Sequence, residues 1–305
     1  MKIAFIGFGE AARAFASTLR EEGSVTFSAF DILTAQGRDK PVREAAERLG
    51  AQVCKTPAEA VESADWVFSA VTAADSLDAG RSVAKLLKPG QVFIDINSVS
   101  GGRKVETAAT VTTGGAAYLD MAVMAPVHPK GHRTPVLIAG PQVVELGRRL
   151  GLMGFDLQIV GEEIGAATTI KMLRSMFVKG LEAVTVQTLL AARAAGRFDE
   201  IYASLSTSFP GLGWPAFPKY LVERVTRHGV RRAAEMRESA VTMAELGFPA
   251  GHAMGLAVAA LQQEVGELGL RLDETGDLED LYDTVLDARA GTNERKPGEF
   301  KEDAA

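Results

Sequence analysis

The chain opens with a short apolar run, Ile3 to Ile6, that stops at a glycine-rich segment and gives way at once to a helix-favouring stretch. The glycine-rich segment reads Gly7-Phe8-Gly9-Glu10-Ala11-Ala12. In this strand–turn–helix order, Gly7 makes the tight turn, Gly9 lets a pyrophosphate approach the backbone, and Ala12 lets the helix lie close to the strand. The free N–H groups at the start of the helix face the phosphates. The pattern therefore predicts a dinucleotide-binding unit at the N-terminus.

A carboxylate stands where the second predicted strand, residues 25–30, ends. This residue, Asp31, follows the glycine turn by about twenty residues, which is the spacing of the acidic residue that binds the ribose 2′-hydroxyl of NAD. A carboxylate there also repels a 2′-phosphate, so we predict NAD as the cofactor. Arg38, Lys40 and Arg43 follow closely and could reverse the preference, which keeps NADP as the alternative. An ordinary α/β turn that is rich in glycine is the other interpretation of the segment.

The composition excludes several classes of protein. The 33 lysines and arginines and the 39 acidic residues give a net charge of −6, so no basic field indicates nucleic acid or an acidic membrane as a partner. Cys54 is the only cysteine, which excludes an intramolecular disulfide and indicates a reducing compartment. No segment reaches about 18 uninterrupted apolar residues. We therefore expect a soluble, cytoplasmic protein that binds neither nucleic acid nor a membrane.

The first half of the chain alternates short apolar strands with helices. Alternation of this kind implies an α/β fold with a doubly wound parallel sheet of the Rossmann type. The strands are predicted at residues 3–6, 25–30, 52–54, 66–71, 92–96, 118–123 and 136–139.

The pattern changes near Gly161. From Glu163 to about Gly196 the chain has the character of one long helix, and the remainder is almost entirely helical, with breaks around 209–218 and 247–251. An all-α domain is therefore expected to follow the nucleotide-binding domain. The predicted parts are a Rossmann domain over 1–161, an all-helical substrate and dimerisation domain over 162–290, and a polar tail over 291–305.

Lys171 lies on the predicted long helix, and helical spacing puts Thr168, Arg174 and Ser175 on the same face. The small residues before the lysine would let the helix approach the nucleotide-binding domain closely. Desolvation lowers the pKa of a lysine, so a lysine held there could move a proton to or from a hydroxyl or carbonyl group. The alternative is a solvated surface lysine, or one that lies over apolar neighbours.

The whole chain resembles the β-hydroxyacid dehydrogenase superfamily, which includes the 3-hydroxyisobutyrate dehydrogenases and the nucleotide domain of 6-phosphogluconate dehydrogenase. Four motifs carry the resemblance, in the family's order. They are the glycine turn, Asp95-Ile96-Asn97-Ser98-Val99-Ser100 at the family's Asp-x-Ser-Thr position near the nicotinamide, Asp120-Met121-Ala122-Val123-Met124-Ala125-Pro126 at its Asp-Ala-Pro-Val-Ser-Gly-Gly position, and the helix that carries Lys171. The run 231–236 resembles a divergent branch with a phosphogluconate-dehydrogenase-like C-terminal domain.

The resemblance implies an NAD(P)-dependent oxidoreductase that transfers a hydride between the nicotinamide and a small hydroxy acid, or a related alcohol or carbonyl compound. Lys171 takes the place of the family's catalytic lysine and would act as general acid and base. The implied cofactor-binding residues are Gly7, Phe8, Gly9, Glu10, Ala11, Ala12, Asp31, Val71, Thr72, Asn97 and Ser98. The implied substrate-binding residues are Ser98, Met124, Ala125, Pro126, Ser175, Arg231 and Glu235. A homodimer or larger homo-oligomer is expected, because the family's helical domain packs against its mate.

The sequence departs from the family's pattern at three places. Met124-Ala125-Pro126 stands where the family has Ser-Gly-Gly, and it lacks the hydroxyl and the amides that would hold a substrate carboxylate. Ser175 replaces an asparagine, and Ala234-Glu235 replaces a Lys-Asp pair. A substrate that is bulkier, more apolar or oriented differently would fit these changes. Cations that remain for an acidic substrate include His128, Lys130, His132, Arg133, Arg231 and Arg232.

Two other functions stay open. An imine reductase shares this architecture, but another residue usually occupies its lysine position, so Lys171 favours the dehydrogenase. A sensor that binds the cofactor without turnover would fit the altered segment at 124–126. No histidine has metal-ligand spacing with a carboxylate or with Cys54, so no metal site is predicted. The sequence identifies neither the substrate nor the direction of the reaction.

Overall fold

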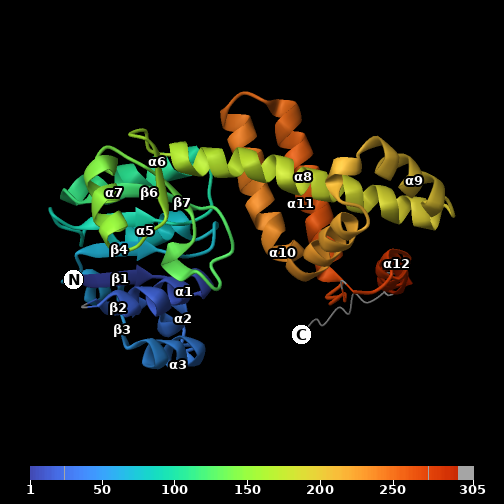
Figure 1. The fold of residues 1–305 in the computed structure, drawn as a ribbon. Helices are drawn as coiled ribbons and strands as arrows, with labels where there is room; N and C mark the ends of the chain where they lie inside the picture. Colours follow the sequence, from blue (N-terminus) through green and yellow to red (C-terminus); the bar gives the residue numbers. More distant parts are fainter. Residues whose placement is uncertain (24, 274, 295–305) are drawn as a thin grey trace, which may run out of the picture. The chain divides into compact units, whose positions relative to one another are not determined.

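The structure is a computed structural model that describes residues 1–23, 25–273 and 275–294. The chain divides into two compact units between Leu173 and Arg174, within the long helix α8 (Ala166–Ala194; Figure 1). Among the described residues, all strands belong to the first unit, and the second unit is helical.

The first unit is built on an eight-stranded sheet whose order is β3-β2-β1-β4-β5-β6-β7-β8. The strands are β1 (Lys2–Ile6), β2 (Thr26–Phe30), β3 (Ala51–Val53), β4 (Trp66–Ser69), β5 (Val92–Asp95), β6 (Ala117–Val123), β7 (Val136–Ala139) and β8 (Leu157–Gly161). The helices that precede α8 are α1 (Glu10–Leu19), α2 (Ile32–Ala35), α3 (Lys40–Leu49), α4 (Pro57–Val61), α5 (Ser76–Ala84), α6 (Gly101–Val111) and α7 (Val143–Leu152).

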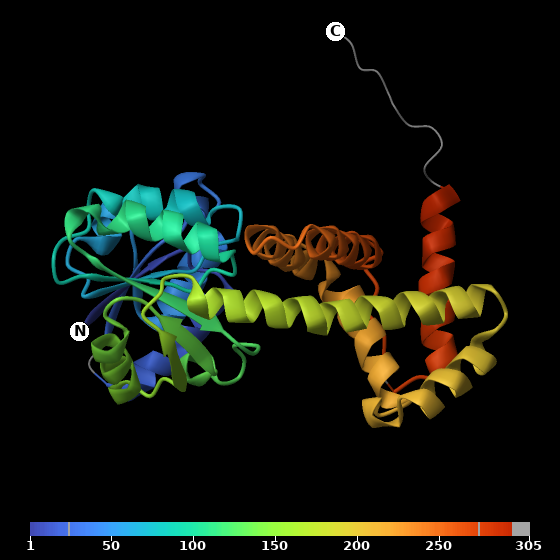
Figure 2. The same cartoon turned by 90° about the horizontal axis from the view of Figure 1, so that it is seen from above.

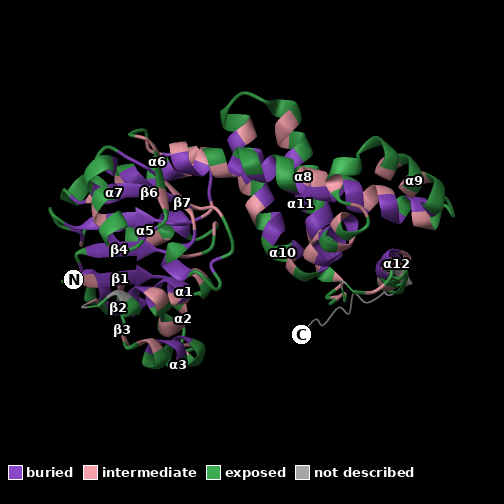
Figure 3. Ribbon diagram, viewed as in Figure 1, coloured by how far each residue is buried: buried purple, intermediate pink, exposed green. Residues whose placement is uncertain are grey.

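Each strand sends alternate side chains to opposite faces of the sheet, and helices cover both faces, so the sheet is buried on both sides. In β1, Ile3 and Phe5 join a core with α1, α3 and α7. Ala4 and Ile6 point the other way and join a core with α4, α5 and α6. Figure 2 shows helices on either side of the sheet, and Figure 3 shows its central strands as buried. The predicted doubly wound α/β fold is therefore confirmed.

Two strands, β7 and β8, run opposite to the other six, and β7 is the one that was predicted to be parallel to them. β7 pairs antiparallel with β6, with Val123 opposite Val136, whereas the pairs from β3 to β6 are parallel. The segment 124–135 returns the chain to the neighbouring position without the crossover helix that a parallel connection usually uses. The sheet is thus mostly parallel, and the prediction that 136–139 continues a parallel sheet is wrong in direction.

The second unit contains the later part of α8 and four further helices. These are α9 (Phe198–Ser208), α10 (Ala216–Glu245), α11 (Pro249–Glu267) and α12 (Leu278–Glu294). Their apolar faces enclose a core that includes Val186, Leu189, Leu190, Val222, Val225, Met236, Val265, Tyr282 and Val285. The gaps between α9 and α10 and between α10 and α11 confirm the predicted breaks.

The predicted division of labour between the domains stays a prediction. β8 ends at Gly161, where the predicted nucleotide-binding domain ends, and the contacts divide the chain between Leu173 and Arg174. α12 runs to Glu294, so the start of the expected polar tail, 291–294, is helical. Residues 295–305 of that tail lie outside the described residues. In the described part of the chain, no helix combines the length and the apolar character that crossing a bilayer requires.

Helices α10 and α11 approach closely where two glycines face each other. A Cβ on Gly229 would lie 2.1 Å from the carbonyl oxygen of Gln262 and 2.9 Å from the Cα of Gly266. Those atoms are backbone atoms, which cannot turn aside as a side chain can. Gly180 in α8 gives a contrast, because a Cβ there would meet nothing within 4 Å.

We expect Gly229→Ala to lower the free energy of unfolding by about 1–3 kcal/mol, the usual cost of overpacking. Gly180→Ala is the matched control and should raise it by up to about 1 kcal/mol, because alanine favours the helix over glycine. Urea unfolding followed by circular dichroism measures both. A Gly229→Ala variant as stable as the parent would show that the helix contact is not as tight as the structure has it.

Candidate active site

The glycine turn follows β1 and requires glycine at its first position. Gly7 has a φ of +85°, and a Cβ there would lie 2.5 Å from the carbonyl oxygen of Ala70, beyond the end of β4. The backbone N–H of Phe8 donates to Asp31 Oδ2 at 2.8 Å. Asp31 Oδ1 accepts from the Leu33 N–H at 3.0 Å and caps α2. Asp31 therefore lies at the end of β2, as expected, and also holds the turn in place.

The second half of the turn is open. A Cβ on Gly9 would meet nothing within 4 Å, and Gly9 and Glu10 are exposed. Ala12 is completely buried, so α1 lies directly on the sheet. The first N–H groups of a helix lack acceptors within that helix, and the positive end of the helix dipole lies there. An open surface beside such donors fits the pyrophosphate of a dinucleotide, with Gly7 to Ala12 and Asp31 as the residues that would hold it.

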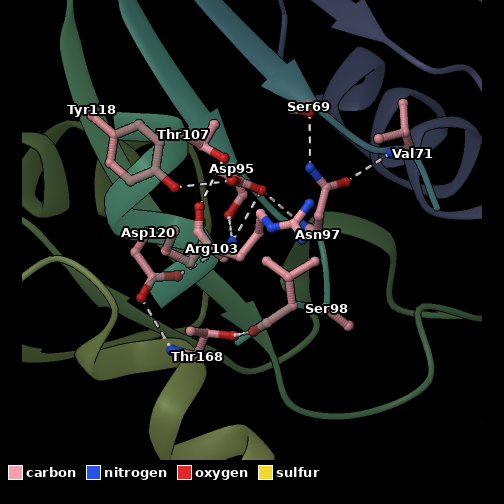
Figure 4. A network of polar contacts seen from close by, with 12 residues as sticks. Ser69, Val71, Asp95, Asn97, Ser98, Arg103, Thr107, Tyr118, Asp120 and Thr168 are labelled. Atoms are coloured by element: carbon pink, nitrogen blue, oxygen red, sulfur yellow. Dashed lines mark hydrogen bonds and ion pairs between the residues drawn. The ribbon is translucent and has the colours of Figure 1, made fainter. Parts of the chain in front are cut away.

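The ends of β4 and β5 are joined by the side chain of Asn97. Its Oδ1 accepts from the Val71 N–H at 2.8 Å, and its Nδ2 donates to Ser69 Oγ at 2.9 Å (Figure 4). Both halves of this buried amide are thus used inside the protein, so Asn97 fixes the backbone on which Val71, Thr72 and Ser98 are carried. Thr72 is exposed and donates to Asp75.

Two of the predicted site residues meet directly. The Nζ of Lys171 donates to Ser98 Oγ at 2.6 Å, and both residues are half-buried. Ser98 follows β5, whereas Lys171 lies in the second turn of α8. The approach of these elements depends on glycine, because a Cβ on Gly165 would lie 3.0 Å from the carbonyl oxygen of Gly101. The pair can hold a proton at Nζ or Oγ and exchange it with a neighbouring oxygen.

A buried cluster of charged residues supports the two segments that carry this pair. Lys104, Asp95 and Asp120 have no exposed surface. Lys104 Nζ lies 2.6 Å from the backbone oxygen of Asp95, 3.0 Å from its Oδ1 and 3.3 Å from Asp120 Oδ1. The hydroxyl of Tyr118 donates to Asp95 Oδ2 at 2.9 Å. Burial raises the pKa of Asp120, which the charge of Lys104 opposes, and burial also raises the pKa of Tyr118 well above its ordinary value.

The cluster connects the elements that carry Ser98 and Lys171. Asp120 Oδ2 accepts from the Thr168 N–H at 3.0 Å, and Thr168 Oγ1 donates to the backbone oxygen of Val99 at 2.6 Å (Figure 4). Asp95 Oδ1 accepts from the Asn97 N–H at 2.9 Å. The start of α8 and the segment after β5 are therefore tied to one buried ammonium group.

The sequence analysis missed Lys104, although a signal was present. Within α6, the buried residues are Lys104, Thr107, Ala108 and Val111, which follow the i, i+3, i+4, i+7 spacing of a helix face that packs on a core. A lysine on such a face needs buried partners. Asp95, the last residue of β5, and Asp120, in the middle of the neighbouring β6, supply them.

The segment that replaces the family's Ser-Gly-Gly follows β6. The N–H of Met124 donates to the carbonyl oxygen of Pro135 at 2.9 Å, and Pro126 has no N–H to offer. Ala125 and Pro126 are exposed, and Met124 is half-buried. The structure therefore brings no row of amides together here, and a carboxylate of the substrate would need other partners.

In the second unit, three predicted substrate residues gather around a lysine that was not predicted. Lys179 Nζ lies 2.7 Å from Glu235 Oε2 and 3.3 Å from Ser175 Oγ. Arg231 pairs with the other oxygen of Glu235, as its i,i+4 spacing indicates. Lys179 is almost completely buried, which lowers its pKa, while Glu235 acts in the opposite direction. Its place four residues after Ser175 on α8 was the available signal.

Comparisons with known proteins agree with these observations. A family model described as NADP oxidoreductase, coenzyme F420-dependent, matches residues 2–98, and a domain of unknown function, DUF1932, matches residues 192–265. A conserved hypothetical protein from Sinorhizobium meliloti is 34% identical, with 95% of this chain and 96% of that chain covered, and a TM-score of 0.75.

Two enzymes are similar to this chain at lower sequence identity. The 2-(hydroxymethyl)glutarate dehydrogenase of Eubacterium barkeri is 25% identical over 185 residues, which are 58% of this chain and 59% of that enzyme. The 3-hydroxyisobutyrate dehydrogenase of Mycobacterium tuberculosis is 18% identical, with a TM-score of 0.70 over 93% of this chain and 98% of that one. The latter likeness shows a shared fold.

The fold and the glycine turn together define the class of protein. The chain has a Rossmann-type, NAD(P)-binding domain like that of oxidoreductases, followed by a helical C-terminal unit. The chain belongs to the family of the Sinorhizobium meliloti conserved protein, joins a nucleotide-binding domain to a DUF1932 domain, and is similar in sequence and structure to the 3-hydroxyacid dehydrogenases. The resemblance to the β-hydroxyacid dehydrogenases is thus confirmed.

We expect Lys104→Met to lower the free energy of unfolding by about 3–5 kcal/mol near pH 8, because it leaves buried carboxylates without their cation. The pKa of Asp120, already raised by burial, would rise further. The folded variant then binds more protons than the unfolded chain, so its stability falls as pH rises and the loss should be smaller near pH 5.

Urea unfolding of the parent and the variant at both pH values measures this difference. Lys85→Met is the control, because Lys85 is exposed and its loss should change the free energy of unfolding by less than about 0.5 kcal/mol. An equal, small effect of both substitutions would contradict the role of the buried ammonium group.

Proposed function

We propose that this protein is an NAD(P)-dependent dehydrogenase or reductase that acts on the CH–OH group of a small hydroxy acid or a related alcohol or carbonyl compound. The observation that carries the proposal is the contact between Lys171 Nζ and Ser98 Oγ in the same unit as the dinucleotide turn. The similarity to hydroxyacid dehydrogenases in sequence and fold supports it.

In the proposed reaction, the cofactor transfers the hydride and the side chains of Lys171 and Ser98 handle the proton. When bound, the nicotinamide supplies or accepts the hydride. In the direction of oxidation, Lys171 Nζ takes the proton of the substrate hydroxyl, and in the direction of reduction it returns that proton to the carbonyl oxygen. Ser98 Oγ fixes the position of Nζ through their hydrogen bond. That Ser175, Arg231 and Glu235 bind the substrate stays a prediction.

We expect Lys171→Ala to lower kcat by about 10²–10⁴, the usual worth of a positioned general acid or base, while cofactor binding stays nearly unchanged. Lys171→Arg should lower kcat as well, because a guanidinium group stays protonated and cannot take the proton of the substrate hydroxyl. The assay uses a panel of small hydroxy acids that includes 3-hydroxyisobutyrate and 2-(hydroxymethyl)glutarate, with NADH affinity measured separately by fluorescence. Lys85→Ala, which changes an exposed lysine of the same unit, is the control. A near-normal kcat in the alanine variant would make Lys171 structural and favour the imine reductase.

We also propose NAD as the preferred cofactor, because the Asp31 carboxylate stands at the end of β2. Each oxygen of Asp31 accepts one backbone N–H and keeps a lone pair for a ribose hydroxyl. Asp31→Asn keeps an acceptor and removes the charge, so the ratio of kcat/KM for NADP to that for NAD should rise by about tenfold, or 1.4 kcal/mol. Equal or better efficiency of the parent with NADP would contradict the preference.

The proposed assembly is a homodimer or larger homo-oligomer formed through the second unit. On α8, Phe177 is 73% exposed and Val184 is 66% exposed, which is unusual for such large apolar side chains on one helix. Phe177→Glu should therefore shift the protein toward the monomer, and the exposed Asp199 of α9 offers a control, as Asp199→Asn. Sedimentation velocity at micromolar concentration measures the mass. A monomeric parent would contradict the proposal.

A further inference from the structure

A hollow of about 200 Å³ lies on the side of the first unit, between α1, α3 and the loop that follows β6. Arg13 of α1, Arg48 of α3 and His128 of the loop all line it, and Ser17 adds a hydroxyl. The apolar part of the lining consists of Ala14, Ala45, Leu49 and Pro129. No acidic residue is among the described residues that line the hollow.

The charges of the two arginines are not neutralised by the protein. Across the described residues, neither Arg13 nor Arg48 forms an ion pair. Two other basic residues of the same loop are engaged elsewhere. His132 is completely buried with its Nδ1 2.7 Å from Thr18 Oγ1, and Arg133 pairs with Glu21 at 3.4 Å. The basic residues that line the hollow are Arg13, Arg48 and His128.

Arg13 is held in position before any ligand arrives. Its Nε donates to the backbone oxygen of Phe8 at 2.6 Å, and its guanidinium lies over the Phe8 ring, 5.9 Å from the centroid. On the opposite wall, the backbone oxygen of Arg48 accepts from Arg20 at 3.0 Å. A held guanidinium loses little conformational freedom when it binds, which strengthens binding.

Two residues that line the hollow, Arg48 and Ser17, lie away from the surface assigned to the dinucleotide, whereas Arg13 is hydrogen-bonded to Phe8 of the glycine turn. A dinucleotide binds at the carboxyl ends of parallel strands. Arg48 stands next to the last residue of α3, shortly before β3 begins at Ala51, and Ser17 lies near the end of α1. These residues therefore lie toward the amino ends of β2 and β3, the edge of the sheet away from the glycine turn.

We infer that this hollow binds the phosphate group of a small organic phosphate. Guanidinium groups match the oxygens of phosphate in paired hydrogen bonds, and His128 and the Ser17 hydroxyl can donate further ones. The apolar lining would receive the organic part, and the volume limits the ligand to a small molecule. The protein has a net charge of −6, yet two arginines without ion-pair partners line the same hollow. The hollow therefore attracts anions, although the protein as a whole repels them.

Isothermal titration of the full chain with phenyl phosphate and with inorganic phosphate, at constant ionic strength, tests the inference. Both should bind saturably with a dissociation constant in the millimolar range or lower, and phenyl phosphate should bind more tightly because it also covers the apolar lining. Arg48→Met should weaken both by about tenfold or more. Arg43→Met is the matched control, since Arg43 lies on the same helix and pairs with Asp39, and it should change affinity less than about twofold.

Three results would overturn the inference: no saturable binding, equal weakening by Arg48→Met and Arg43→Met, or loss of binding when NAD⁺ is added at saturation. The last result would assign the phosphate to the glycine turn. NADH titrated alone reports on the proposed function, so a failure of cofactor binding is seen separately from a failure at the hollow.

Discussion

The ammonium group of Lys104 is the charge on which the arrangement of the first unit depends. It lies beside the end of β5 and the middle of β6, without any exposed surface, between two carboxylates that would otherwise repel each other in a medium of low polarity. A buried ion pair is weak evidence for stability, since its desolvation offsets much of its attraction. The cluster orients the segments that carry Ser98 and Lys171. Asp95 Oδ1, which also faces the ammonium group, accepts from the Asn97 N–H, and Asp120 Oδ2 accepts from the Thr168 N–H.

Because the cluster orients these two segments, Ser98 and Lys171 come into contact. Thr168 is held by Asp120 and by Val99, so the first turn of α8 is set against the segment after β5. Lys171 lies one turn further along the same helix, where its Nζ meets the serine hydroxyl. In this account Ser98 and Lys171 are held in position because buried groups, which water does not reach, support the segments that carry them.

The sequence predicted the elements whose signals are local. The glycine turn, the strands from β1 to β6 and the long helix α8 were all visible as apolar runs, turn residues and helical spacing. The antiparallel β7 was not, because strand direction depends on how the segment 124–135 returns through space. Lys104 and Lys179 have helical spacing that was visible in the sequence, but the partners that show each lysine to be buried are far away in sequence, so both were missed. For Asp31, the position was predicted, but its bond to the N–H of Phe8 required the structure.

A double-mutant cycle on kcat tests the central claim that Ser98 and Lys171 act as one unit. It compares Ser98→Ala, Lys171→Ala and the double variant on a substrate that the parent turns over. The account predicts strong non-additivity, with the double variant no slower than Lys171→Ala alone, because removing either residue disables the same proton transfer. Losses that multiply, so that the double variant falls by the product of the two single effects, would contradict it.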